Sequence, residues 1–128
     1  MAGSITLERS EGDGVAYLTL SNPAKLNAID IAMWRELHAL MLHLQALPPE
    51  DAPHAVILRG AGGQFASGGD IVEFANFRFE EHSLRDFHEN VVAPALHALL
   101  DCDIPLYAQI EGACIGGGLE IAGQCDLR

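Results

Sequence analysis

Two glycine-rich turns, each joining an apolar segment to the start of a helix, constrain this sequence more than any other feature. The first turn belongs to residues 56–70 and the second to residues 106–120. Glycine permits positive φ and lets a ligand approach the backbone closely, and a helix N-terminus presents unpaired N–H groups. Two such turns side by side would direct two N–H groups at one oxygen, as in an oxyanion hole. The alternative is that the glycines serve only to make tight turns.

The first part of the chain predicts a hairpin followed by a helix. Residues 5–9 and 15–20 have the pattern of two strands joined by a turn. Asp30 begins a predicted helix that runs to about residue 47, because apolar side chains recur there every three or four positions. The predicted buried face consists of Ile31, Trp34, Leu37, Met41 and Leu44.

The rest of the chain continues the alternation of strands and helices. Residues 55–58 and 104–110 are short apolar runs that predict strands buried on both faces. Further helices are predicted over residues 70–77, 83–100 and 119–124. In the second of these, Ser83 is the predicted cap and Pro94 is expected to interrupt the helix. A last strand is predicted to start at residues 125–128. This alternation indicates an α/β fold with a largely parallel sheet. The length predicts a single domain over residues 1–128.

Charge and composition exclude several classes of protein. Seven basic residues against 18 acidic ones give a net charge of −11, whereas nucleic acids and anionic membranes both require a basic surface. No apolar run is long enough to span a membrane, and no signal peptide is expected from the first residues. Three cysteines without C-x-x-C spacing favour reduced thiols in a cytoplasmic protein. No His/Cys spacing predicts a metal site.

Glu120 follows the second turn by two residues and falls in the first turn of the predicted helix. Because Leu119, Ile121 and Ala122 are apolar, we expect a mostly buried carboxyl whose pKa burial would raise. Beside two N–H donors, such a group is well placed as a general acid or base. The alternative is a carboxylate that only caps the helix.

Other motifs for nucleotides and nucleophiles are incomplete. Residues 60–65 follow a predicted strand and match G-x-G-x-x-G except at the last position, which is Phe65. Glu80 lies about 20 residues further on, where an acidic residue would bind the ribose. A dinucleotide-binding domain built on this loop therefore stays open as a second interpretation. Ser67 does not form a G-x-S-x-G nucleophile motif, because Phe65 stands where the first glycine would be.

Three segments carry a resemblance to a known family. Residues 22–28 (N-P-A-K-L-N-A) are similar to an N-P-x-x-x-N-A motif, and residues 56–71 are similar to V-x-x-x-G…F-x-x-G-x-D. Residues 105–128 are similar to a signature around a triple glycine. In this order and over nearly the whole chain, the segments resemble the N-terminal half of the enoyl-CoA hydratase/isomerase (crotonase) family.

The resemblance implies a crotonase-like α/β fold of ββα repeats, incomplete at the C-terminus, and binding of acyl-CoA thioesters. By position, the N–H groups of Gly69 and Gly117 would form the oxyanion hole that stabilises the thioester enolate. Glu120 falls on the first of two catalytic glutamates of the hydratases. The implied substrate-binding residues are Lys25, Leu26 and Ala28 near the CoA nucleotide, with Ala66, Ser67, Gly68 and Asp70 along the acyl channel.

The resemblance also implies an activity and an assembly. The expected reaction is hydration of a 2-enoyl-CoA to a 3-hydroxyacyl-CoA, with no separate cofactor because coenzyme A is part of the substrate. The expected assembly is a homotrimer or a hexamer. The second hydratase glutamate would lie beyond Arg128. Two alternatives therefore stay open, an isomerase or another reaction of the family, and a non-catalytic acyl-CoA-binding module.

Overall fold

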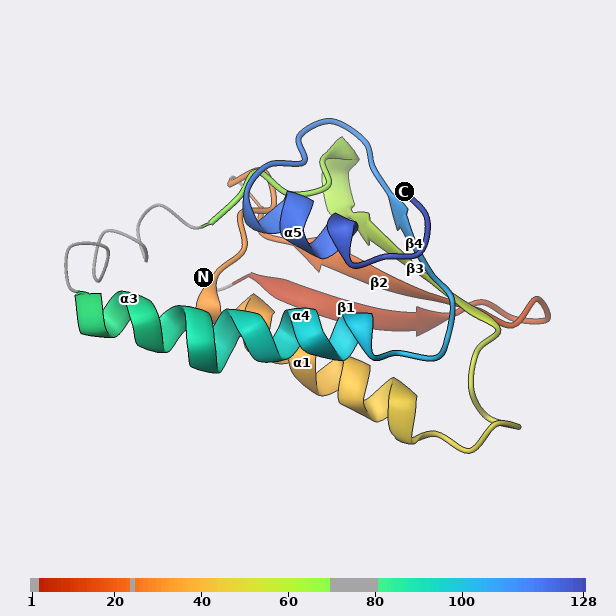
Figure 1. Cartoon of the computed structure of the whole chain (residues 1–128). Helices are drawn as coiled ribbons and strands as arrows, with labels where there is room; N and C mark the ends of the chain where they lie inside the picture. The colour runs from red at the N-terminus through yellow and green to blue at the C-terminus, as the bar shows by residue number, and fades with distance from the viewer. Residues whose placement is uncertain (1–2, 24, 70–80) are drawn as a thin grey trace.

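The centre of the fold is a four-stranded mixed sheet (Figure 1). The computed structural model describes residues 3–23, 25–69 and 81–128. The strands lie in the order β1 (Ser4–Arg9), β2 (Val15–Ser21), β3 (Ala55–Gly60) and β4 (Leu106–Gln109). The first two strands form the predicted antiparallel hairpin, and β3 and β4 are added in parallel. Helices connect the parallel strands, so the predicted α/β fold is confirmed.

Helix α1 (Ile31–Ala46) confirms the helix predicted after Asp30. The Asp30 side chain accepts a hydrogen bond from the Met33 N–H at 2.8 Å and so caps the first turn. The buried residues of this helix are Met33, Trp34, Leu37, Met41 and Leu44. Met33 therefore joins the predicted face, whereas Ile31 is only half-buried.

A π-helical turn, η2 (His88–Val92), joins α3 (Glu81–Phe87) to α4 (Ala93–Leu100). The Ala93 N–H donates to the carbonyl of His88, five residues earlier. Pro94 has no N–H, and a proline ring crowds the carbonyl four residues before it. A wider turn just ahead of Pro94 accommodates both constraints, so the predicted interruption takes this form.

Three predictions at element ends have different outcomes. The long helix is described from Glu81, so Ser83 lies inside it and is not its cap. The helix predicted over residues 70–77 lies outside the described residues. The predicted strand at the end of the chain is reduced to one parallel bridge between Leu127 and Tyr107.

The sheet has one buried face and one that is more exposed. Register places Leu18 beside Leu58 and Leu58 beside Ala108, and all three side chains are buried. On the opposite face Ile57 is half-buried and Tyr107 is exposed. The prediction that β3 and β4 are covered on both faces is therefore wrong for the described chain. The buried face packs against α1, α4 and a last helix, α5 (Gly117–Gly123).

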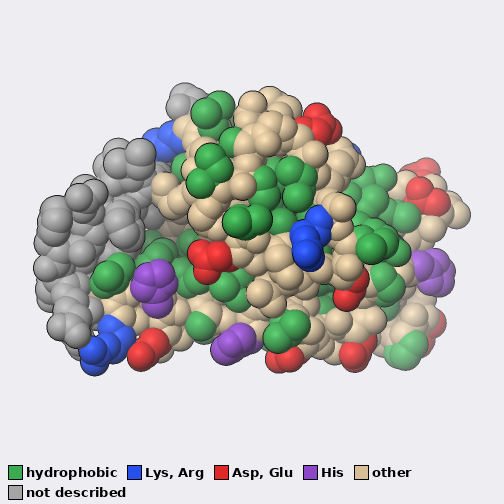
Figure 2. All heavy atoms as spheres, turned by 45° about the horizontal axis from the view of Figure 1, so that its top comes forward, with side chains coloured by type: hydrophobic (Ala, Val, Ile, Leu, Met, Phe, Trp, Pro, Cys, Tyr) green, Lys and Arg blue, Asp and Glu red, His purple; other side chains and the backbone are tan. Residues whose placement is uncertain are grey.

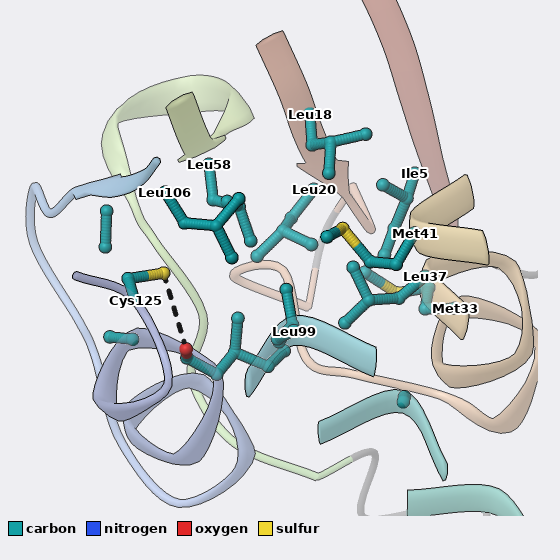
Figure 3. Close-up of a cluster of buried hydrophobic side chains, with 14 of the residues drawn as sticks. Ile5, Leu18, Leu20, Met33, Leu37, Met41, Leu58, Leu99, Leu106 and Cys125 are labelled. Atoms are coloured by element: carbon teal, nitrogen blue, oxygen red, sulfur yellow. Dashed lines mark hydrogen bonds between the residues drawn. The ribbon is translucent and has the colours of Figure 1, made fainter. Parts of the chain in front are cut away.

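Figure 3 shows the part of this core where Leu58 and Leu106 lie beside Leu99 and Cys125. The Cys125 side chain is 5% exposed, and its thiol donates a hydrogen bond to the carbonyl of Ile121 at 3.6 Å. Burial, with the nearby Asp126 carboxylate, raises the pKa of the Cys125 thiol to about 12. The thiol therefore stays protonated in the folded chain at neutral pH.

We expect the free energy of unfolding to fall as the pH rises above 9. The ordinary pKa of the Cys125 thiol is 9.0, whereas in the fold it is about 12. Between these values the unfolded chain binds fewer protons than the folded chain, so stability falls by about 1 kcal/mol per pH unit from this group. Urea unfolding on either side of pH 9 measures the slope. An equally steep slope in Cys125→Ala would contradict the assignment, although Cys102 and Cys114, whose pKa values burial also raises, add a slope common to both proteins.

Several large hydrophobic side chains are exposed on the described surface. They are Leu26, Leu42, Leu100, Tyr107, Ile110, Ile115, Leu119 and Leu127. Figure 2 shows hydrophobic side chains gathered over the middle of one face, with acidic groups around them. Within the described residues, no helix is long and apolar enough to cross a membrane.

We expect the 128-residue chain, purified alone, to self-associate. Large apolar side chains at the surface favour contacts between copies, because association removes them from water. Sedimentation velocity over a range of concentrations measures the effect. A monomer at all concentrations that also melts cooperatively would show the expectation to be wrong.

Candidate functional site

The two glycine-rich turns lie side by side, the arrangement that an oxyanion hole would require. The Ala66 N–H donates to the carbonyl of Ala113 at 2.9 Å, and the Ile115 N–H donates to the carbonyl of Ala66 at 3.1 Å. A Cβ atom built on Gly118 would lie 2.7 Å from the Cβ of Ala66. Because that distance is shorter than a normal carbon–carbon contact, only glycine lets the two segments approach so closely.

The turns also meet through Gly68 and Gly116, which have φ values of 112° and 51°. A Cβ atom on Gly116 would lie 3.6 Å from the Cα of Gly68. Gly117 is buried and Gly69 is exposed. Within the described residues, neither the Gly69 N–H nor the Gly117 N–H donates a hydrogen bond. The arrangement therefore leaves two backbone donors, one from each turn, available to an acceptor.

The segment before α1 contacts the first glycine turn. The Ile29 N–H donates to the carbonyl of Gly68 at 2.7 Å. The Ser67 N–H donates to the carbonyl of Leu26 at 3.0 Å, and the Ser67 hydroxyl donates to the carbonyl of Lys25 at 2.9 Å. Lys25 and Leu26 are exposed beside the first turn. All three segments that carried the resemblance are therefore in contact.

Some of the predicted substrate-binding residues lie beneath this surface. Ala66 is fully buried, Ala28 is 6% exposed, and Gly68 is also buried. Ala66 and Gly68 support the turns through backbone hydrogen bonds, whereas the backbone of Ala28 bonds Lys25 and Asn22 in its own loop. Ser67 is half-buried. Asp70 lies outside the described residues.

Asn27 is a structural residue of the site, although the sequence pattern predicts no role of its own for it. Its side chain is 4% exposed, and its φ is 57°. The Asn27 Oδ1 atom accepts from the Asn22 N–H at 2.9 Å, and Nδ2 donates to the carbonyls of Ala61 and Gln64, both at 2.8 Å. The Gln64 Oε1 atom in turn accepts from the Ala113 N–H at 2.6 Å. One amide thus ties the Lys25 loop to the first turn, and Gln64 ties that turn to the second.

We expect Asn27→Gly to lower the free energy of unfolding by roughly 2–4 kcal/mol, because it leaves buried polar groups without partners. Glycine tolerates the left-handed backbone, so this variant isolates the hydrogen bonds. Asn27→Ala should cost about 1 kcal/mol more through backbone strain. Urea unfolding measures both variants.

Gln45→Ala is the matched control for Asn27→Gly, because it removes an amide that bonds Asp103 at the exposed surface. Its expected cost is under about 1 kcal/mol. Equal costs for the buried and the exposed amide would contradict the role given to Asn27.

Glu120 lies in the first turn of α5, where its N–H donates to the carbonyl of Gly116 at 2.9 Å. The prediction that its side chain is mostly buried is wrong, because Glu120 is exposed and Leu119 is 58% exposed. Helix α5 buries one face only, formed by Gly117, Gly118, Ile121 and Ala122. Side chains of a helix lean toward its N-terminus, and positions three apart are neighbours. The Glu120 carboxylate is therefore placed beside the Gly117 turn from the solvent side.

The dinucleotide interpretation of residues 60–65 can be compared with the geometry. Residues 61–63 form a short 3-10 turn, η1 (Ala61–Gly63). A dinucleotide site needs the N-terminus of a full helix at that point to hold the pyrophosphate, so the dinucleotide interpretation fails. Within the described residues, no group of three His, Cys, Asp or Glu side chains could hold a metal ion.

Comparisons with known proteins agree with the geometry. The model of a family described as enoyl-CoA hydratase/isomerase matches residues 10–128. The chain is 33% identical over 113 residues to a probable enoyl-CoA hydratase of Rhizobium meliloti, covering 88% of this chain and 41% of that protein. It is 31% identical over 123 residues to a mitochondrial Delta(3,5)-Delta(2,4)-dienoyl-CoA isomerase of Mus musculus, covering 89% and 36% respectively.

The fold is similar to a solved enoyl-CoA hydratase/carnithine racemase of Magnetospirillum magneticum. The TM-score is 0.88 and the sequence identity 38%, over 97% of this chain and 45% of that one. The chain therefore spans less than half the length of each of these three proteins.

Proposed function

Because the chain belongs to the enoyl-CoA hydratase/isomerase family, we propose that it binds an acyl-CoA thioester and hydrates a 2-enoyl-CoA to a 3-hydroxyacyl-CoA. The observation that carries this proposal is the contact between the two glycine turns, each with one backbone N–H, at Gly69 or Gly117, that donates no hydrogen bond within the described residues. The thioester oxygen gains negative charge when the enolate forms. Donors that are fixed before the reaction stabilise that charge without reorganising.

In this proposal Glu120 is the acid and base of the reaction. Its carboxylate takes a proton from a water molecule while the water oxygen bonds to carbon 3 of the substrate. The electron pair of the double bond moves toward the thioester oxygen, and carbon 2 then takes the proton from the Glu120 carboxyl, which restores the carboxylate. The position of Glu120 one helical turn after Gly117 supports this role.

The segment around Lys25 is the proposed contact for coenzyme A. Lys25 and Leu26 are exposed, and Ser67 holds both of their carbonyls beside the first turn. A lysine ammonium group favours phosphate. A local contact of this kind accommodates an anionic ligand on a protein whose net charge is −11.

Incubation of the purified protein with a 2-enoyl-CoA tests the reaction. Hydration removes the conjugated double bond, and loss of its absorbance measures the rate, while calorimetry measures thioester binding separately. Turnover supports the proposal. Binding without turnover of any enoyl-CoA would favour the non-catalytic acyl-CoA module, and absence of binding would contradict both.

An isomerase is the second candidate, because one relative is named as a dienoyl-CoA isomerase. The same two donors would stabilise a dienolate, and the carboxylate would move a proton between carbon atoms. A 3-enoyl-CoA distinguishes the two reactions. Isomerisation produces conjugated absorbance from it, whereas a hydratase leaves it unchanged.

We propose that coenzyme A enters as part of the substrate, with no separate cofactor and no metal.

The proposed assembly is a homotrimer or a hexamer, and exposed hydrophobic residues such as Leu119 and Ile110 would favour such contacts. Sedimentation equilibrium tests the assembly.

The proposed location is the cytoplasm, because three free cysteines agree with a reducing compartment. Cell fractionation tests this location.

A further inference from the structure

Helix α1 and the residue just before its Asp30 cap contact both glycine turns. At one turn, the Ile29 N–H donates to the carbonyl of Gly68 at 2.7 Å. At the other, the Trp34 side chain packs against Gly117. Ile29 and Trp34 lie on either side of the Asp30 cap, and the Trp34 N–H donates to the Asp30 carbonyl at 3.1 Å. One rigid element therefore fixes the relation between two segments that are far apart in the sequence.

The contact between Trp34 and Gly117 is tight. A Cβ atom built on Gly117 would lie 3.0 Å from Cζ2 and 3.7 Å from Cη2 of the indole, and 3.7 Å from Cγ1 of Ile29. The Trp34 side chain is 3% exposed. A buried indole has little freedom to move, because its neighbours are closely packed. The rigid edge of the Trp34 ring therefore lies against the backbone of Gly117.

We propose that Trp34 is a positioning residue that fixes the direction of the Gly117 N–H. The inference rests on the proposed function, in which that N–H bonds the thioester oxygen. A donor held in the correct direction before the reaction stabilises the enolate, whereas a donor that can tilt away stabilises it less. Trp34 acts only through Gly117, so its loss should affect the reacting state more than the binding of substrate.

Substitution of Trp34 separates positioning from general stability. We expect Trp34→Ala to lower kcat about 10–100-fold, the effect of misplacing a catalytic group by about 1 Å. The KM and the Kd for a saturated thioester, butanoyl-CoA, should change less than about 3-fold. Trp34→Phe keeps an aromatic ring but shortens the edge that meets Gly117, and it should give an intermediate kcat.

Met41→Ala is the matched control, because Met41 lies on the same helix, is 1% exposed and lies in the same core. Its loss should lower the melting temperature as the loss of Trp34 does, with kcat within about 2-fold of the parent value. A fall in kcat as large as that of Trp34→Ala would overturn the proposal, because it would assign the effect to core packing.

The fluorescence of Trp34, the only tryptophan in the sequence, gives a readout that does not depend on turnover. We expect butanoyl-CoA to change the emission of the unmodified protein over the concentration range in which calorimetry shows binding. Calorimetric binding without a change in emission would overturn the role of Trp34 and leave the proposed function standing. Absence of calorimetric binding would overturn the proposed function and this inference together.

Discussion

Gly117→Pro should lower turnover of a 2-enoyl-CoA by about 10²–10³-fold, the usual cost of losing one oxyanion donor. Proline has no N–H, so the variant removes the donor that the second turn presents. Gly117 is the first residue of α5, a position at which proline is tolerated in helices. The loss should therefore come from the missing donor and not from a broken helix. Steady-state kinetics, with circular dichroism as the check on folding, measure the effect.

Gly117→Ala is the matched control for this substitution. Both variants add a Cβ atom about 3.0 Å from the Trp34 ring, but only alanine keeps the N–H. We expect alanine to lower turnover about 10-fold at most, since a small displacement of the donor weakens its bond without removing it. Equal losses for alanine and proline would assign the effect to crowding against Trp34. Unchanged turnover in a folded proline variant would exclude Gly117 from the reaction.

The order of strands and helices could be predicted because each element has a local signal. In α1, apolar spacing and the Asp30 cap agree, and the structure follows them closely. The exposure of Tyr107 on β4 had no such signal, because the cover on each face of a sheet depends on which distant elements pack there. Pro94 similarly indicates that the helical ladder is interrupted, but not that a π turn absorbs the interruption.

The site was partly predictable for the same reason. Parallel strands end at one edge of a sheet, so turns that follow neighbouring strands β3 and β4 are expected to meet there. The partners of Asn27 could not be predicted, because they are backbone carbonyls 34 and 37 residues away. The contact of Trp34 with Gly117 is also tertiary. Glu120 was expected to be buried from its apolar neighbours, but those neighbours lie on both faces of a helix that buries only one.

The exposure of Glu120 makes its substitution a sharper test of chemistry. We expect Glu120→Gln to lower hydration of a 2-enoyl-CoA by about 10²–10⁴-fold, or roughly 3–5.5 kcal/mol in the barrier. The amide keeps the shape of the side chain but cannot take a proton from water. Because the side chain is exposed, its loss should change stability only through the helix dipole, by less than about 1 kcal/mol.

Two measurements are needed to interpret the Glu120→Gln result. Calorimetry gives the Kd for butanoyl-CoA, and absorbance gives the hydration rate. Unchanged affinity with lost hydration identifies a proton-transfer role, because the ground state contains no transferred proton. Glu50→Gln, which removes an exposed carboxylate in the turn after α1, should change neither quantity. Hydration at the parent rate would mean that Glu120 only stabilises the start of α5 through its negative charge. A parallel loss of affinity and rate would instead assign Glu120 to substrate binding, because a group used only in the transition state leaves the Kd unchanged.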